Sequence, residues 1–237
     1  MKSRLAHAVS KIFDLFSLVL NLRVGGFLVA GFTIWLFAKI SNEVLEKETQ
    51  AFDQATLLTL RHLHTPLRNQ IMIGVTALGQ PSVLLIVTLS LGIWLLLKRC
   101  RPEAITMVIG TVGALGLNYL LKELFRRARP PIWEHVISVT QYSFPSGHAM
   151  ISLVVYGLSA YLLAIRFYRW RGLIFSLSIL LILAIGFSRL YLGVHWPSDV
   201  AAGYATGIAW LMACILELEI WHRRRNRRSS SRDGSDK

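Results

Sequence analysis

Residues 145–166 have the sequence PSGHAMISLVVYGLSAYLLAIR, in which a short polar motif leads into a long apolar stretch. No side chain is charged from Ala149 to Ile165, and the first cation follows at Arg166. A helix that crosses a membrane needs about 20 mostly apolar residues. The stretch therefore predicts a transmembrane helix over residues 147–166, with the polar motif at one of its ends.

Five further segments of similar character accompany this one. They cover approximately residues 22–40, 80–98, 103–121, 172–188 and 198–221. Hydrophobic residues make up 54% of the 237-residue chain, a fraction too high for an ordinary soluble domain. We therefore predict an all-α fold, in which six transmembrane helices form one membrane-embedded domain over residues 1–221.

The net charge of +13 is concentrated in four clusters. They are Lys2, Arg4 and Lys11; Lys98, Arg99 and Arg101; Arg166, Arg169 and Arg171; and the segment from Arg223 to Arg228. Six spans place all four clusters on one side, which the positive-inside rule assigns to the cytoplasm together with both termini. This distribution favours an orientation signal and contact with anionic membrane lipids, not a nucleic-acid partner. We expect the basic segment 222–237 to be a disordered cytoplasmic tail.

The segment 41–70 lies on the opposite, outer side. Its apolar residues recur at helical spacing among acids and histidines, at Phe52, Ala55, Leu58, Leu63 and Leu67. This pattern predicts an amphipathic helix that lies in the membrane interface.

Two basic segments oppose the charge rule. Lys122, Arg126, Arg127 and Arg129 fall between the third and fourth spans, and Arg189 falls between the fifth and sixth. By alternation both segments are on the outer side, where a bound phosphate would compensate their charge. Lys122, Arg126 and Arg129 are spaced i, i+4 and i+7, so that one helical face can present all three. Guanidinium groups make forked contacts with phosphate oxygens. The alternative is that they anchor a span at the interface.

The polar motif at 145–148 precedes the fourth span. Gly147 allows a close approach of the backbone to an anion, and the N-terminus of a helix favours a phosphate through its free N–H groups and dipole. Ser146 adds a hydroxyl donor, and His148 is placed to protonate a leaving oxygen. The alternative is a capped helix start with an incidental histidine.

The third motif follows the fifth span. Asp199 comes four residues after His195, so at the start of a helix its carboxylate can accept a hydrogen bond from one imidazole nitrogen. That bond fixes the tautomer and leaves the other nitrogen free to attack phosphorus. A surface histidine beside a helix-capping aspartate is the alternative for this segment alone. All three motifs lie at outer ends of predicted spans, so we expect them to converge.

Together the motifs resemble the three-part signature of the type 2 phosphatidic acid phosphatase family. The matching residues are Lys122 to Arg129-Pro130, Pro145-Ser146-Gly147-His148, and Ser188-Arg189 with His195 and Asp199. The surrounding sequence is similar to the small bacterial membrane members, although the family also includes soluble vanadium haloperoxidases. The resemblance implies a six-span helical bundle with a metal-independent site near the outer membrane surface, and the bacterial inner membrane as its location.

The resemblance also implies a role for each motif residue. Lys122, Arg129 and Arg189 would hold the phosphate together with the backbone of Ser146 and Gly147; His195 would be the nucleophile that forms a phosphohistidine, Asp199 its partner and His148 the acid for the leaving group. No cofactor is required.

Three further residues are candidates for supporting or extending the phosphate site, on the basis of their position in the sequence alone. Asn118 lies one turn before Lys122 and is a candidate for orienting it, with polar packing between helices as the alternative. Arg126 and Arg127 are candidates for a second phosphate or an acidic headgroup, with interface anchoring as the alternative.

The leading hypothesis is hydrolysis of a lipid phosphate monoester or pyrophosphate. Phosphatidylglycerol phosphate, undecaprenyl pyrophosphate and phosphatidic acid all present the required phosphoryl group. Phosphotransfer to a lipid or sugar hydroxyl is the alternative within enzymes, and a non-catalytic lipid-phosphate binder is a third hypothesis. The histidines and the aspartate count against a binder, since binding alone needs no nucleophile. The predicted spans exclude a soluble haloperoxidase.

Overall fold

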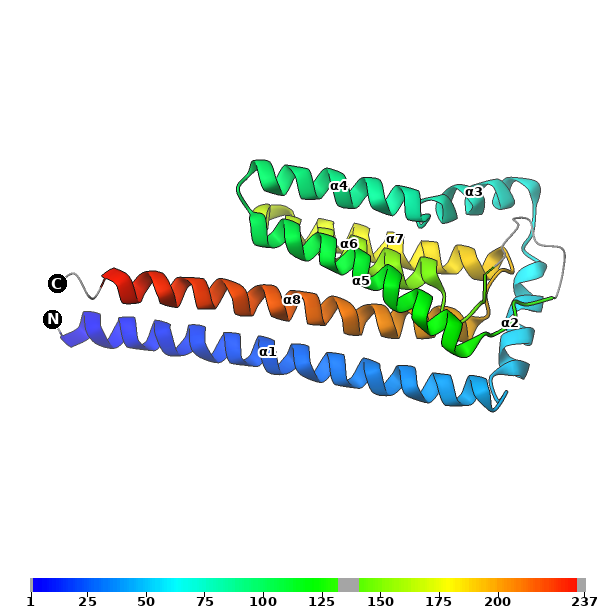
Figure 1. Cartoon of the computed structure of the whole chain (residues 1–237), viewed down its shortest axis with the longest axis horizontal. Coiled ribbons are helices and arrows are strands. Elements are labelled where there is room, and N and C mark those ends of the chain that lie inside the picture. Colours follow the sequence, from blue (N-terminus) through cyan, green and yellow to red (C-terminus); the bar gives the residue numbers. More distant parts are fainter. Residues whose placement is uncertain (1, 132–140, 234–237) are drawn as a thin grey trace.

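The computed structural model describes the backbone of residues 2–131 and 141–233, and the side chains within residues 24–131 and 141–225. Throughout these residues the regular structure is helical, which confirms the predicted all-α class. The helices are α1 (Lys2–Leu45), α2 (Gln50–Arg61), α3 (Pro66–Ala77), α4 (Pro81–Leu97), α5 (Arg101–Phe125), α6 (Gly147–Arg166), α7 (Arg171–Tyr191) and α8 (Pro197–Asp233), with a short 3-10 turn (Tyr168–Trp170) before α7. Figure 1 shows the long helices packed side by side.

The predicted membrane spans are confirmed. Five stretches within the described residues are long and apolar enough to cross a membrane: Val24–Leu45, Arg101–Phe125, Gly147–Arg166, Tyr168–Tyr191 and Pro197–Arg225. Helices α3 and α4 meet the same criterion together, bent by 45° at their junction, and the spans number six when this pair is counted as one. Large apolar side chains such as Phe27, Leu97 and Leu180 are more than 60% exposed, as lipid-facing residues of a membrane bundle are.

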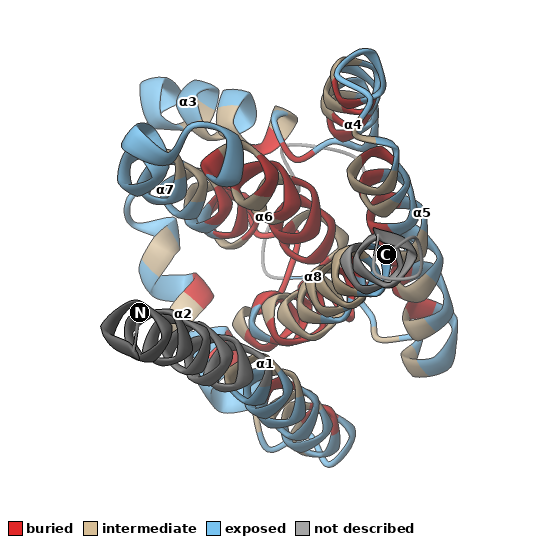
Figure 2. Ribbon diagram, turned by 90° about the vertical axis from the view of Figure 1, so that its left-hand side faces the viewer, coloured by how far each residue is buried: buried red, intermediate tan, exposed pale blue. Residues whose placement is uncertain are grey.

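Helix α6 lies at the centre of the bundle and is its most deeply buried helix (Figure 2). Val154, Val155 and Leu158 are completely buried. They belong to one apolar cluster with Met107 of α5 and Cys214 of α8. The polar motif at the start of α6 is therefore held by the best-packed part of the molecule.

The two ends of the bundle differ in what they carry. The start of α1, the α4–α5 and α6–α7 connections and the end of α8 lie together at one end (Figure 1). These connections contain the basic clusters at 98–101 and 166–171, as predicted from the alternation of spans. The opposite end, which we call the motif end, holds α2, the ends of α5 and α7 and the starts of α6 and α8.

The segment 41–70 differs in detail from the single interfacial helix that we predicted. Helix α1 continues to Leu45, and α3 begins at Pro66 behind the capping residue Thr65, so only α2 is a separate helix lying across the motif end (Figure 1). The buried residues of α2 are Asp53 and Leu57, whereas the predicted apolar position Phe52 is 68% exposed. The face of α2 that meets the bundle therefore carries Asp53 and Leu57, and Phe52 lies on the outward face.

Helix α8 extends into the segment 222–237, for which the sequence predicts a disordered tail. Helix α8 continues to Asp233, and residues 234–237 lie outside the described part of the chain. The physical reason is visible in the sequence: neither Pro nor Gly interrupts the basic segment before Gly234, so nothing ends the helix earlier.

Helix α8 approaches α6 closely at Gly203. A Cβ atom at this position would lie 2.7 Å from the carbonyl oxygen of Ser146 and 3.2 Å from Cβ of Ala149. Small residues permit such close approach between transmembrane helices. The contact brings the start of α8, with its aspartate, directly against the start of α6.

We predict that Gly203→Ala destabilises the protein, because the new methyl group meets backbone rather than a flexible side chain. Overpacking of this kind costs about 1–3 kcal/mol. The measurement is the unfolding temperature of the detergent-solubilised protein. Gly116→Ala on α5 is the matched control, since nothing lies within 4 Å of its added Cβ. Equal unfolding temperatures for the two variants would contradict the packing account.

Candidate active site

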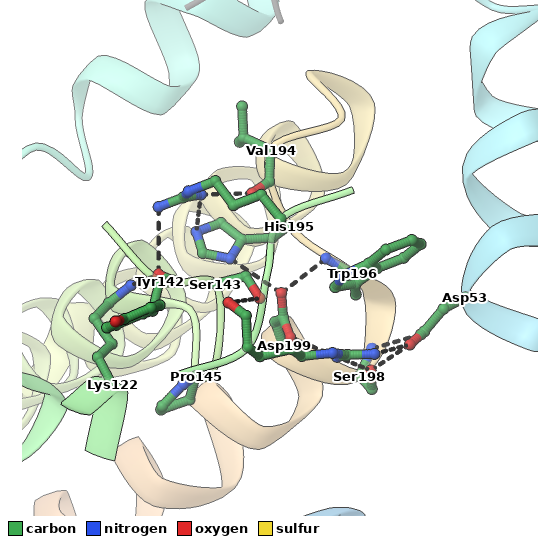
Figure 3. A network of polar contacts seen from close by, with 12 residues as sticks. Asp53, Lys122, Tyr142, Ser143, Pro145, Val194, His195, Trp196, Ser198 and Asp199 are labelled. Atoms are coloured by element: carbon green, nitrogen blue, oxygen red, sulfur yellow. Dashed lines mark hydrogen bonds and ion pairs between the residues drawn. The ribbon is translucent and has the colours of Figure 1, made fainter. Parts of the chain in front are cut away.

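Four helix ends meet at the motif end and bring the three motifs together (Figure 3). Lys122 lies in the last turn of α5, Ser146 directly precedes α6, and Arg189 lies in the last turn of α7. The backbone N–H of Ser146 donates to the carbonyl oxygen of Asp199 at 3.0 Å, which joins the second motif directly to the third. The predicted convergence is confirmed.

The sequence predicts that the first motif presents its cations on one helical face, and the structure shows that it does not. Helix α5 ends at Phe125, and Arg126 adopts a left-handed conformation with φ 45°. The Arg126 side chain is 66% exposed and pairs with Glu123 at 3.5 Å. Because α5 ends at Phe125, the residues from Arg126 onward turn away from the helix axis. The side chain of Arg126 pairs with Glu123 and not with a residue of the other motifs.

Lys122 and Arg129 nevertheless face the same site. The Lys122 ammonium donates to the carbonyl oxygen of Tyr142. Arg129 donates from Nε to the carbonyl oxygen of Gln141 at 2.7 Å and from Nη1 to that of Val194 at 2.5 Å. Neutral carbonyl oxygens orient these cations without cancelling their charge, so the charge stays available for an anion.

The start of α6 is shaped by Asn118, whose contacts agree with the alternative of polar packing and not with a role in orienting Lys122. Its side-chain amide donates to the carbonyl oxygen of Pro145 at 3.3 Å, and a Cβ at Gly147 would lie 2.8 Å from its Oδ1. Asn118 therefore holds the turn before α6, and Gly147 is required for this close approach. The Ser146 N–H donates to the Asp199 carbonyl, whereas the buried Ser146 hydroxyl has no partner in the structure.

Arg189 is a second buried group with unused hydrogen-bonding capacity. It is only 2% exposed, and its Nη1 donates to the hydroxyl of Thr76 on α3 at 2.8 Å. Its Nε is buried without a partner. Buried polar atoms are rarely left unpaired, so two such atoms at one site point to a polar ligand.

His195 and Asp199 form the predicted pair. Gly193, with φ 69°, turns the chain between α7 and α8 so that His195 precedes the helix that carries Asp199. The His195 Nδ1–H donates to Oδ2 of Asp199 at 3.3 Å, and Nε2 accepts from Arg129 Nη1 at 3.3 Å. These partners assign the proton to Nδ1 and the lone pair to Nε2.

The surroundings of His195 favour the neutral ring. Burial lowers the pKa of His195 well below its usual value, and the nearby charges of Arg189, Arg129 and Lys122 lower it further, against a backbone hydrogen bond to Ser143 that raises it. A neutral imidazole retains the Nε2 lone pair that a nucleophile needs.

His148 lies in the first turn of α6, as predicted. A Cβ at Gly79 would lie 2.9 Å from its Cδ2 atom, so the connection between α3 and α4 packs against the ring. The charges of Arg189, Arg129 and Lys122 act on this histidine as well as on His195. Both imidazoles therefore belong to the same cationic site.

Arg127 occupies a different place from the headgroup contact that we had considered. Its guanidinium donates to Oδ1 of Asp199 at 2.6 Å and to Oδ2 of Asp53 at 2.8 Å. The contacts of Asp53 and Thr76 are not predicted from the sequence, since each residue lies far along the chain from its partner. A carboxylate at an otherwise unremarkable helix position carries no local signal of such a contact.

Within residues 24–131 and 141–225, no three His, Cys, Asp or Glu side chains are grouped as a metal site would require. The candidate ligand of the cations is instead an anion. Glu134 and His135, for which the sequence suggests no role, lie outside the described residues.

Comparison with known proteins decides the family. Residues 103–221, half of the chain, match the model of the PAP2 superfamily. The chain belongs to the PAP2 superfamily. A phosphatidylglycerophosphatase B from Bacillus subtilis is 31% identical over 75% of this chain and 86% of its own length. An undecaprenyl-diphosphatase from Sulfolobus acidocaldarius is 33% identical over 64% of this chain and 70% of its own.

A solved PAP2 structure agrees with the fold. The crystal structure of a transmembrane PAP2-type phosphatidylglycerolphosphate phosphatase from Bacillus subtilis matches with a TM-score of 0.75 and 26% sequence identity. The match covers 78% of this chain and 93% of that one. The helical arrangement at the motif end thus belongs to an architecture known from a PAP2 phosphatase.

We predict that orthovanadate, an oxyanion that mimics phosphate, binds at the cation cluster formed by Lys122, Arg129 and Arg189. Binding should raise the unfolding temperature of the purified protein. Arg189→Lys removes the unpaired Nε and the forked geometry, so it should abolish most of this rise. Arg126→Lys, at an exposed cation outside the cluster, is the control and should retain it. An equal rise in all three proteins would place the anion elsewhere.

Proposed function

We propose that this protein is a multi-pass membrane phosphatase that removes a phosphoryl group from a lipid phosphate monoester or pyrophosphate. One observation carries the proposal: the His195–Asp199 pair lies at the same site as the cations Lys122, Arg129 and Arg189. The site also contains two buried polar atoms without a partner, Ser146 Oγ and Arg189 Nε. A lipid-phosphate binder would use the cations alone. The buried, neutral histidine with a fixed tautomer supports a nucleophile.

The first chemical step is an attack of His195 Nε2 on phosphorus. As the N–P bond forms, Arg129 exchanges its contact with Nε2 for a phosphate oxygen, and the bond from phosphorus to the lipid oxygen breaks. Lys122, Arg129 and Arg189 stabilise the charge on the equatorial oxygens without reorganisation of solvent. His148 gives a proton to the departing oxygen, and Asp199 stabilises the positive imidazole.

The second step hydrolyses the phosphohistidine. The leaving lipid takes the His148 proton with it, so this imidazole becomes a base that removes a proton from water. The resulting hydroxide attacks phosphorus, the N–P bond breaks, and His195 returns to its neutral form with inorganic phosphate released. One histidine thus acts as acid and then as base, as microscopic reversibility requires.

The charge pattern supports an orientation in the membrane. Basic residues gather at the end opposite the site, and by the positive-inside rule this supports a cytoplasmic position for that end and both termini. The site then lies near the outer face of the membrane, with the bacterial inner membrane as the location.

An apolar groove supports a substrate with a long chain. The groove has a volume of about 920 Å³ and runs between α1, α6, α7 and α8. Its wall includes Leu153, five residues after His148, and Tyr204, five residues after Asp199. An acyl or prenyl chain that enters from the bilayer finds an apolar surface within two helical turns of the phosphate site.

The similar proteins support two substrate classes. One is named for phosphatidylglycerophosphate and another for undecaprenyl diphosphate, and both lipids carry a terminal phosphoryl group on an apolar anchor. Phosphatidic acid remains a third candidate. The residues of the site contact the phosphoryl group that all three share.

We predict that the purified protein releases phosphate in chelator from at least one of these three lipids. His195→Ala should lower the rate by about 10⁴-fold or more, because no other group forms the covalent intermediate. Asp199→Asn should leave slow turnover, since the tautomer is no longer fixed. Phosphate release is measured separately with each lipid.

The controls separate the competing functions. A His195→Ala variant that retains most of its activity would exclude the covalent mechanism. A folded wild-type protein that releases no phosphate from any lipid would favour phosphotransfer or binding instead. Analysis of products with an added lipid or sugar alcohol then identifies a transferase by its phosphorylated acceptor.

We predict that the effect of His148→Ala depends on the leaving group. General acid catalysis contributes about 10²–10⁴-fold when the departing alkoxide is a poor leaving group. Formation of the phosphoenzyme from a lipid alcohol ester should therefore slow by this factor, whereas its formation from a p-nitrophenyl phosphate should slow much less. The measurement is the rapid-quench rate of that first step, and equal losses would remove His148 from the role of acid.

A further inference from the structure

Arg127 lies between two buried carboxylates. It donates at 2.6 Å to Asp199 and at 2.8 Å to Asp53, and neither aspartate has any exposed side-chain surface. The guanidinium itself is 17% exposed. Its Cζ atom lies 5.4 Å from the ring centre of Trp196, so an aromatic face covers it as well.

Asp53 is held as firmly as the arginine. Its Oδ1 accepts the backbone N–H of Ser198 at 3.0 Å, and its Oδ2 accepts the Ser198 hydroxyl at 2.6 Å. The same hydroxyl accepts from Arg127 Nη1 at 2.7 Å. Asp53, Arg127 and Ser198 therefore fix one another by four hydrogen bonds (Figure 3).

This arrangement has a direct consequence for Asp199. A buried carboxylate is costly unless it is paired and hydrogen-bonded. One oxygen of Asp199 accepts from Arg127, and the other accepts from Trp196 N–H at 2.9 Å and from His195. The orientation of the carboxylate toward the imidazole thus depends on an arginine that Asp53 holds in place.

The charges also favour the reaction. Two carboxylates share one guanidinium, so one negative charge remains in excess behind His195. Positive charge develops on this imidazole when its Nε2 attacks phosphorus. Asp53 contributes to the stabilisation of that charge although it does not touch the ring.

We propose that Asp53 and Arg127 are positioning residues that hold Asp199 ionised and correctly oriented behind His195. The inference rests on the proposed function of His195 as nucleophile. It assigns a role in the reaction to α2, which lies outside the residues 103–221 that match the PAP2 model. By contrast with the motif residues, Asp53 acts through its contacts with Arg127 and Ser198, which position Asp199.

A double-mutant cycle tests the proposal. Asp53→Asn keeps the size of the side chain and removes its charge, so kcat should fall by about 10- to 100-fold, the range known for carboxylates that orient an active-site histidine in metal enzymes. KM should change little, because the phosphate-holding cations are untouched. In an Asp199→Asn background the same substitution should cause no further loss, since its route of action is already removed. Equal losses in both backgrounds would overturn the proposal.

Two further variants separate positioning from folding. Leu57→Ala removes the other buried side chain of α2, so it should lower the unfolding temperature and leave kcat of the folded protein unchanged. Ser198→Ala removes one hydroxyl from Asp53 and should lower kcat without unfolding the protein. A kcat loss in Leu57→Ala as large as that in Asp53→Asn would reduce Asp53 to a structural role. A wild-type protein without turnover would instead contradict the proposed function.

Discussion

The site depends on the balance of charge between the cations and carboxylates that meet at the motif end of the bundle, where Lys122 and Arg189 are buried. Four cations and two carboxylates make up this group. The cations are Lys122, Arg127, Arg129 and Arg189, and the carboxylates are Asp53 and Asp199. Two positive charges are thus in excess, which equals the charge of a phosphate monoester dianion. Protein carbonyls orient Lys122 and Arg129 without cancelling their charge, so this charge stays available for an anionic ligand.

The packing of the helices holds these charged side chains in a defined arrangement. Helix α6 is the most deeply buried span and carries the second motif at its start. Gly203 lets α8 approach so closely that the Ser146 N–H reaches the Asp199 carbonyl. The loop before α6 is anchored by Phe144, which stacks on Phe37 of α1 with ring centres 6.0 Å apart. The rigid centre of the bundle therefore fixes the histidines, and the lipid-facing helices α1 and α4 surround it.

Much of this could be predicted from local sequence. Apolar stretches revealed the spans. His195 and Asp199 were found because they lie four residues apart at the start of a helix, and His148 was found because it belongs to a polar motif at the start of a span. The failures have a common cause, which is that a contact between distant segments leaves no local pattern. Arg127 and Arg129 are neighbours of the same type, yet one binds carboxylates and the other faces the phosphate site. Asp53 resembled any polar residue of an amphipathic helix until its partner was known. The end of α5 at Phe125 likewise depends on a left-handed residue at Arg126, for which Pro130 was an imprecise guide.

A phosphoryl group that passes through His195 can be trapped there. The protein is quenched during turnover of a substrate labelled with ³²P in its terminal phosphate, and the label is located by peptide mapping. We expect a base-stable, acid-labile phosphoramidate on His195, which accumulates when hydrolysis is slowed and is absent from His195→Ala. Label on another residue, or turnover at a normal rate without any labelled protein, would contradict this mechanism.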